Sequence, residues 1–414
     1  MLILNTDNII EYLRPRLPEV IFDSSTEVHS IGGNGIEEEG DGYLNYIFKV
    51  TTSEFSCIIK QALEHMRHNE SRALPASRNK LEYDIMAIRH KICPEYVPTP
   101  YFYDEENHVI AMEDCSYLKI PRFQFNKNIM YDNFAENCAK YLAATHFYTS
   151  EYYLETDAFR GLTTHFMSPK LRQIMEDSIF VTLFGHHEFD YTLGEEFVNF
   201  AKSLAYAPEF ECERYKLRHS FISNGECLVH GDLHTSNMFA GDNALKVIDM
   251  EFTFTGPFSF DLGYLAGNLI AQYASATFRE FPSESDRAEF KQYILHSLRT
   301  LYTTYVTEFC KHCDADCKDF YKDVPGLQTQ FKKTILRDYP GFTSVANWSR
   351  ASDSFAYPDY DVITDTKERC HAVTMSLMID WQIMFNRYHY TTIDDFIRDI
   401  LYVERRYLKH IGRL

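Results

Sequence analysis

The chain has 414 residues, of which 45% are hydrophobic, and it carries a formal net charge of −19. A chain of this length and apolar content can bury a large core, and it suggests two lobes with room for a cleft. The negative charge argues against a nucleic-acid partner, because phosphate backbones are bound by clustered Lys and Arg. No secretory signal or apolar run long enough to span a bilayer is visible, so we expect a cytoplasmic protein with no membrane partner and with reduced thiols.

The N-terminal part of the chain shows the patterns of a small α+β lobe. Residues 31–60 read as strand, turn and strand, and residues 78–91 have the apolar spacing of a helix. A second strand pair is predicted over 99–113, with its turn at 104–107. Lys60 ends an apolar strand-like run, where an ammonium needs an anionic partner unless it lies on an edge strand and keeps its charge in water.

From residue 126 onward the pattern is predominantly helical. Helices are predicted over 134–148, 195–204, 288–309 and 393–408, and strands between 228 and 251 interrupt them. No internal repeat or low-complexity linker is visible. The candidate boundary is a hinge at Met112–Tyr117, which divides the chain into 1–113 and 114–414.

The segment 229–263 reads VHGDLHTSNMFAGDNALKVIDMEFTFTGPFSFDLG and spaces Asp232, Asn237, Asp249 and Glu251 as metal-dependent phosphoryl transfer requires. That reaction needs one carboxylate beside the acceptor hydroxyl and further oxygen ligands that hold Mg²⁺ on the nucleotide. Asp232 fits the first role, and Asn237 can offer an amide oxygen to the metal. Asp249 follows an apolar run typical of a buried strand, and Glu251 can project to the same side if the backbone stays extended.

Each of these residues has an ordinary alternative when taken singly. An Asp that closes a strand is often only a turn or cap residue, and His-Gly-Asp triplets are common. The joint set favours a kinase. Next to it, we interpret His230 and Asp261 as structural braces of the loop, and His146 as a satisfied core or surface residue.

Cys310 and Cys313, with Cys317 close behind, are the one grouping of cysteines that suggests chemistry of its own. The spacing allows a zinc site or a redox pair, but no second matching pair exists. Free thiols on a helical segment are the favoured interpretation.

Several blocks of the sequence resemble the aminoglycoside phosphotransferase and choline kinase group, and most closely the methylthioribose kinase family. The blocks are Gly40–Asn45, Ile58–Ala62, Val109–Asp114 and Val229–Asn268. The resemblance implies a two-lobed, protein-kinase-like α+β fold, with a small β-rich N-lobe that binds nucleotide and a larger, mostly helical C-lobe. It also implies ATP and Mg²⁺ as cofactors, and it suggests a homodimer.

The same resemblance implies roles for individual residues. Asp232 would be the catalytic base, and Asn237, Asp249 and Glu251 would hold the metal. Lys60 would bind nucleotide phosphate and pair with Glu82 of the predicted helix. The remaining nucleotide-binding residues would be the glycine loop with Gly40, Asp41, Gly42 and Asn45, and the adenine hinge with Met112, Glu113 and Asp114.

The sequence departs from the family where the sugar should bind. The family carries two adjacent arginines in its C-terminal part, and the best alignable stretch here, Lys367–His371, offers only Arg369. Because Cys and His cannot copy the rigid donors of a second arginine, the pocket could be rebuilt. The predicted substrate is methylthioribose or a related 5-substituted ribose. The alternatives are a kinase for choline, ethanolamine or an aminoglycoside, and a catalytically silent nucleotide-binding homologue.

Overall fold

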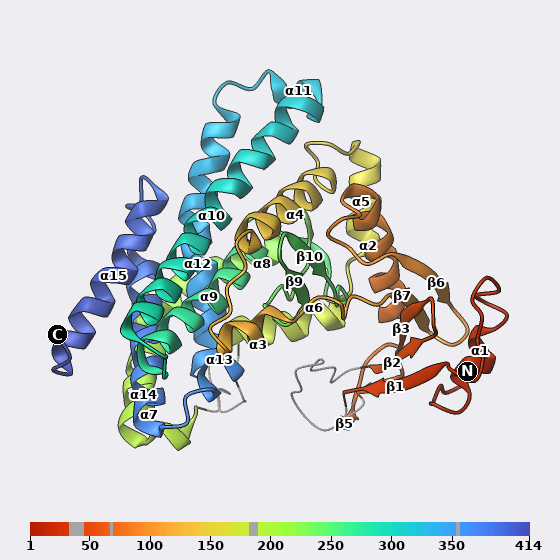
Figure 1. Cartoon of the computed structure of the whole chain (residues 1–414). Coiled ribbons are helices and arrows are strands. Elements are labelled where there is room, and N and C mark those ends of the chain that lie inside the picture. The colour runs from red at the N-terminus through yellow and green to blue at the C-terminus, as the bar shows by residue number, and fades with distance from the viewer. Residues whose placement is uncertain (33–44, 67–68, 182–188, 353–356) are drawn as a thin grey trace. The chain divides into compact units, whose positions relative to one another are not determined.

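The computed structural model describes residues 1–32, 45–66, 69–181, 189–352 and 357–414 (Figure 1). The chain forms two compact units. The first combines Met1–Pro121 with Ser236–Thr253, and the second combines Arg122–Thr235 with Phe254–Leu414. The division into lobes 1–113 and 114–414 stays a prediction. The compact units differ from it in grouping Ser236–Thr253, which carries Asp249 and Glu251, with the N-terminal strands.

An antiparallel sheet forms the first unit's framework, and its described strands follow the order β1-β2-β3-β7-β6 (Figure 1). The strands are β1 (Glu27–Ile31), β2 (Tyr46–Thr51), β3 (Ser56–Gln61), β6 (Pro100–Asp104) and β7 (Val109–Glu113). The predicted strand pairs within 31–60 and 99–113 are therefore confirmed. The helix predicted over 78–91 is α2 (Arg78–Ile92), and a shorter helix, α1 (Ile9–Leu13), precedes the sheet.

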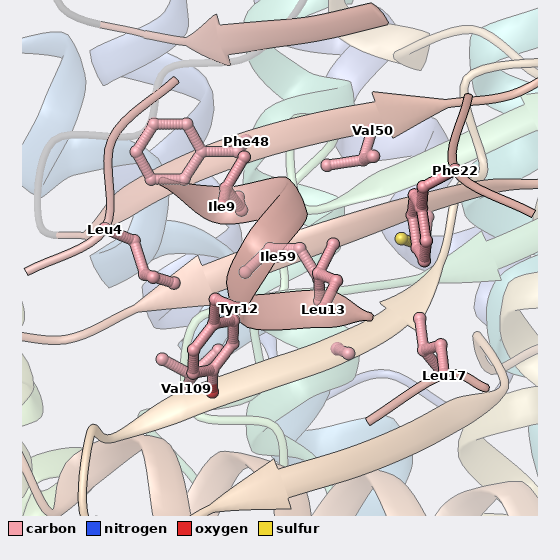
Figure 2. Packing of buried hydrophobic residues seen from close by; sticks show 12 residues of the cluster. Leu4, Ile9, Tyr12, Leu13, Leu17, Phe22, Phe48, Val50, Ile59 and Val109 are labelled. Atoms are coloured by element: carbon pink, nitrogen blue, oxygen red, sulfur yellow. The ribbon is translucent and has the colours of Figure 1, made fainter. Parts of the chain in front are cut away.

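The N-terminal segment covers one face of this sheet. Figure 2 shows Ile9 and Leu13 of α1 directed at Phe48, Val50 and Ile59 of the strands. All of these side chains are buried. Because successive side chains of a strand point to opposite faces, Lys60 follows Ile59 on the face turned away from α1.

Two hairpins complete the first unit. One pairs β4 (His65–Met66) with β5 (Asn69–Ala73), and the other pairs β9 (Met238–Gly241) with β10 (Ala244–Val247). A bridge between Lys119 and Ala240 joins the second hairpin to the segment that follows β7.

The second unit is built mainly from helices, as predicted. They are α3 (Pro121–Asn126), at whose start the unit begins, α4 (Phe134–Tyr148), α5 (Thr156–His165), α6 (Pro169–Glu176), α7 (Glu195–Ala205), α8 (Pro208–Ser223), α9 (Phe260–Phe278), α10 (Glu284–Asp316), α11 (Asp319–Lys322), α12 (Leu327–Ala351), α13 (Pro358–Asp361), α14 (Thr366–Asn386) and α15 (Ile393–His410). A π-helical turn, η1 (Asp177–Val181), a 3₁₀ turn, η3 (Tyr191–Leu193), and the strand pair β8 (Cys227–Val229) with β11 (Phe254–Gly256) are also present.

The predicted helix ends are close to those observed, except in α10. This helix begins at Glu284 because Ser283 caps it, with its hydroxyl accepting the amide of Asp286 at 3.1 Å. The cap and the polar first turn lie outside the apolar pattern that predicted 288–309. Cys310 and Cys313 lie buried on α10 as free thiols. None of the described helices is long and apolar enough to cross a membrane.

Candidate active site

Lys60 lies at the centre of an ion-pair group in the first unit. Its Nζ is 2.8 Å from Glu82 Oε2 on α2 and 2.5 Å from Asp249 Oδ1, which follows β10. Burial alone would lower the pKa of Lys60, but Asp249 and Glu82 raise it above its usual value, so the ammonium stays charged. The structure thus brings together three residues that the sequence analysis assigned to nucleotide and metal binding.

Glu251 belongs to a second buried group, formed with Arg78 and Asn45. Arg78 Nε donates to Glu251 Oε2 at 3.0 Å, and Arg78 Nη2 donates to Asn45 Oδ1 at 2.7 Å. Asn45 Nδ2 lies 3.4 Å from Glu251 Oε1, which closes a triangle. Burial raises the pKa of Glu251, and the neighbouring Asp249 adds to that rise, while the cations Lys60 and Arg78 oppose it.

The β9-β10 hairpin brings the backbone of Asn237 next to Ile248, the residue before Asp249. Met238 pairs with Val247, and the amide of Ile248 donates to the carbonyl of Asn237 at 3.0 Å, so the pairing continues to the residue before Asp249. Asp249 itself has a φ of 59°, in the left-handed region that Asp tolerates better than most residues. The extended backbone that would place Asp249 and Glu251 on the same side is therefore not observed, and the two carboxylates have different partners.

Around Lys60 and Arg78, the described carboxylates outnumber the cations. Three described carboxylates, those of Glu82, Asp249 and Glu251, share two cations, Lys60 and Arg78. Among the described residues, no three His, Cys, Asp or Glu side chains form a metal-binding cluster. Mg²⁺ held on nucleotide phosphates needs only one or two carboxylates, because phosphate and water oxygens supply its other ligands.

The predicted hinge, Met112–Asp114, is tied into the sheet. The amide of Glu113 donates to the Thr99 carbonyl at 2.9 Å, and its carboxylate accepts the Thr99 amide at 3.0 Å. Asp114 is paired with Lys49 at 3.0 Å. These side chains therefore maintain the segment's own structure. Gly40, Asp41 and Gly42, predicted to approach the phosphates, lie outside the described residues.

In the second unit, the loop that carries Asp232 is held by a buried carboxylate. Asp261, on α9, accepts the backbone amides of His230 and Gly231 at 2.6 and 3.1 Å, and its Oδ2 lies 3.1 Å from His146 Nε2. Gly231 has a φ of 89°, which a residue with a Cβ rarely adopts. The amide of Asp232 donates to His230 Nδ1 at 3.3 Å. The structural roles predicted for His230 and Asp261 are confirmed, and His146 is a satisfied core histidine.

The carboxylate of Asp232 faces positive charge and hydrogen-bond donors. Arg350 Nη2, from the end of α12, is 3.5 Å from Asp232 Oδ1 and donates to the Tyr264 hydroxyl at 2.8 Å, while His234 Nε2 is 3.6 Å from Asp232 Oδ2. Burial would raise the pKa of Asp232, but His234, Arg350 and Tyr264 together lower it below its ordinary value. Burial also lowers the pKa of His234, so the permanent positive charge is that of Arg350.

The predicted sugar-binding arginine has other partners in the structure. Arg369, in the first turn of α14, pairs with Asp361 at 3.2 Å and donates to the Thr192 hydroxyl at 3.1 Å. Arg350 and Arg78 were not predicted from the sequence. Arg350 gives no local signal, because it lies on a helix far along the chain from Asp232. Arg78 does give one, since it precedes Glu82 by one helical turn and thus shares a face of α2 with it.

Comparison with known proteins places this chain in a family. The model of the phosphotransferase enzyme family matches residues 199–300, which include the loop from His230 to Glu251. The methylthioribose kinase of Pectobacterium carotovorum subsp. carotovorum is 31% identical over 349 residues, which are 82% of this chain and 86% of that protein. The chain belongs to the methylthioribose kinase family. The methylthioribose kinase of Cronobacter sakazakii is 29% identical over 364 residues, covering 87% of this chain and 90% of that protein.

Members of the family are phosphotransferases, and the enzyme class predicted from the sequence is thereby confirmed. Among solved structures, the choline kinase of Cryptosporidium parvum Iowa II is 12% identical with a TM-score of 0.48, and the match covers 95% of this chain and 100% of that one. An amicoumacin kinase in complex with AMP-PNP and Ca²⁺ is 13% identical with a TM-score of 0.42, over 96% and 93% of the two chains. The family assignment rests on the sequence relatives.

Proposed function

We propose that this protein is an ATP- and Mg²⁺-dependent kinase that transfers the γ-phosphoryl group to a hydroxyl of methylthioribose. Family membership supports this reaction, and the relatives that establish it are named methylthioribose kinases. The single observation that carries the proposal is the ion-pair group of Lys60, Glu82 and Asp249, because it combines a cation suited to phosphate with a carboxylate suited to a phosphate-bound metal.

In this proposal the first unit binds the nucleotide. Lys60, held by Glu82, contributes a positive charge to the phosphates, and Gly40, Asp41, Gly42 and Asn45 are further residues proposed to bind the nucleotide. The segment Met112, Glu113 and Asp114 is the proposed adenine contact, and the carboxylates of Glu113 and Asp114 are already paired within the protein.

Asn237, Asp249 and Glu251 are the proposed metal ligands, all with oxygen donors suited to a hard cation. Bound Mg²⁺ would neutralise charge on the transferring phosphoryl group. Lys60 pairs with Asp249, and Arg78 pairs with Glu251, so each of these two carboxylates has a cationic neighbour.

Asp232 is the proposed catalytic base. Its carboxylate accepts a hydrogen bond from the acceptor hydroxyl and takes the hydroxyl proton as the new oxygen–phosphorus bond forms and the bond to ADP breaks. The surrounding donors keep Asp232 ionised and therefore able to accept that proton.

Arg350 supports a neutral sugar as the acceptor. A cationic acceptor such as choline or an aminoglycoside would approach Asp232 against the permanent charge of Arg350, only 3.5 Å from that carboxylate. A sugar hydroxyl meets no such repulsion, and a guanidinium can donate to sugar oxygens. We assign Arg350 to the acceptor region, while the role of Arg369 toward the sugar stays a prediction.

An acceptor panel tests the proposal. ADP release from ATP is measured with and without Mg²⁺, using methylthioribose, ribose, 5-deoxyribose, choline and an aminoglycoside. We expect Mg²⁺-dependent turnover with a kcat/KM for methylthioribose at least about 100-fold above that for choline or the aminoglycoside. Preferred turnover of a cationic acceptor, or the absence of turnover with every acceptor, would contradict the proposal.

A further inference from the structure

We infer that Arg78 is a positioning residue that holds Glu251 and Asn45 in the arrangement that receives the metal–nucleotide complex. The inference rests on the proposed function, because it assigns a task to Arg78 within nucleotide and metal binding. The hydrogen bonds of the Arg78 guanidinium go to Glu251, Asn45 and two backbone carbonyls, so Arg78 would act through its two side-chain partners.

The guanidinium of Arg78 is almost fully used. Its Nε and Nη2 donate to Glu251 and Asn45, and its Nη1 donates to the carbonyls of Leu63 and Pro75 at 2.9 and 3.1 Å. The two carbonyls anchor the group to its own unit, and the other two donors point at proposed ligand-binding residues. The planar fork of the guanidinium is therefore fixed by the two carbonyls, and its remaining donors orient the side chains of Glu251 and Asn45.

The geometry leaves one carboxylate oxygen of Glu251 available. Oε2 accepts from Arg78 at 3.0 Å, whereas among the described residues Oε1 has only the longer contact of 3.4 Å with Asn45. A carboxylate held by one oxygen presents the other in a defined direction, which is how hydrogen-bonded neighbours usually orient metal ligands.

The same fork fixes the amide of Asn45. The Asn45 oxygen accepts from Arg78 and its Nδ2 faces Glu251, so one guanidinium sets the orientation of both partners. Asn45 directly follows the sequence block Gly40–Leu44, whose glycines the sequence analysis assigned to phosphate binding. Arg78 thus connects Asn45, a proposed nucleotide-binding residue, to Glu251, a proposed metal ligand.

Lysine cannot reproduce this arrangement. It carries the same charge, but its ammonium is a compact group without the planar geometry that reaches Glu251, Asn45 and two carbonyls together. Arg78→Lys therefore retains a positive charge and removes the fork. Arg89 supplies a matched control, because it is another arginine of α2 with 1% exposure and has no assigned role at the site.

The experiment measures AMP-PNP binding by calorimetry across a series of Mg²⁺ concentrations, for the wild type, Arg78→Lys and Arg89→Lys. Thermal unfolding of the three proteins is recorded in parallel. We expect Arg78→Lys to need about 10- to 100-fold more Mg²⁺ for half-maximal nucleotide binding, as losses of residues that orient metal ligands usually do. Arg89→Lys should keep the Mg²⁺ requirement within about twofold of the wild type, whatever its loss of thermal stability.

An unchanged Mg²⁺ requirement in folded Arg78→Lys would overturn the inference and leave Arg78 a purely structural residue. If Arg78→Lys does not fold, Asn45→Ala provides the test, because it keeps the charge of Arg78 and removes the side-chain amide that bonds to Arg78 and faces Glu251. It must then raise the Mg²⁺ requirement for the inference to stand. A wild-type protein without Mg²⁺-dependent AMP-PNP binding would instead refute the proposed function, and this inference with it.

Discussion

Asp232 shows how one residue's neighbours set its chemistry. A buried carboxylate would ordinarily gain a higher pKa and carry a proton more often, which would block it as a base. Here His234, followed by Arg350 and Tyr264, outweighs burial and lowers the pKa of Asp232. Arg350 contributes most reliably, because its charge does not titrate in the accessible pH range.

Replacing Arg350 should therefore change the pH dependence of turnover. In the wild type, the pKa of Asp232 lies below its ordinary value, so protonation of Asp232 should not limit kcat between about pH 5 and 8. In Arg350→Met the positive charge is lost, the pKa of Asp232 rises, and the acid limb of the kcat profile should move to higher pH. Steady-state kinetics across that pH range measures the limb.

Arg350→Lys is the control for this prediction, since it keeps the positive charge. It should leave the acid limb close to that of the wild type even if KM increases. An acid limb at the same pH in Arg350→Met and the wild type would show that Arg350 does not keep Asp232 ionised.

At the scale of elements, the contact between α9 and α12 supports the loop of Asp232. Helix α9 carries Asp261, which holds the amides of His230 and Gly231, and α12 carries Arg350 at its end. The two helices approach closely because α9 presents Gly263 and Gly267 one turn apart. A Cβ at Gly263 would overlap Phe342 and lie 2.8 Å from the amide nitrogen of Thr343.

Gly263→Ala should therefore destabilise the protein although alanine favours helices. Relief of the overlap requires α9 and α12 to separate, and overpacking of this kind costs about 1–3 kcal/mol. Gly267→Ala should cost less, because its nearest contact, the amide nitrogen of Asn347, lies at 3.0 Å. Urea unfolding measures the free energy of unfolding of both variants.

Gly161→Ala on α5 is the matched control. A Cβ at Gly161 meets nothing within 4 Å, so the higher helix propensity of alanine should stabilise this variant by up to about 1 kcal/mol. Equal effects of the substitutions at Gly161 and Gly263 would mean that the close approach of α9 and α12 does not limit stability.

For the molecule as a whole, the sequence predicts those structural features that residues close together in the chain determine. The α+β class, the strand pairs and α2 follow from local apolar periodicity, and all are observed. The pairing of Lys60 with Glu82 follows from family resemblance and is observed. The contact of Lys60 with Asp249 was not predicted and comes from the structure. The brace formed by Asp261 could be predicted because it follows the loop by a short distance in a recognisable motif.

The remaining features depend on contacts that no local pattern encodes. Arg350 reaches Asp232 only because α9 and α12 pack closely, which requires the glycines of one helix to match the surface of the other. Strand alternation predicted that Asp249 and Glu251 point to the same side, but the left-handed backbone of Asp249 breaks the extended conformation that this requires. Arg78 could have been found from its spacing to Glu82, but its link to Glu251 could not.

The most direct test of the central claim separates nucleotide binding from phosphoryl transfer in Asp232→Asn. Calorimetry with AMP-PNP and Mg²⁺ is combined with single-turnover transfer from ATP to methylthioribose, and the exposed Asp242→Asn serves as the control. We expect wild-type nucleotide affinity in both variants, with transfer about 10²- to 10⁴-fold slower in Asp232→Asn only. Transfer at the wild-type rate in Asp232→Asn would show that Asp232 is not the base and would contradict the account given for this site.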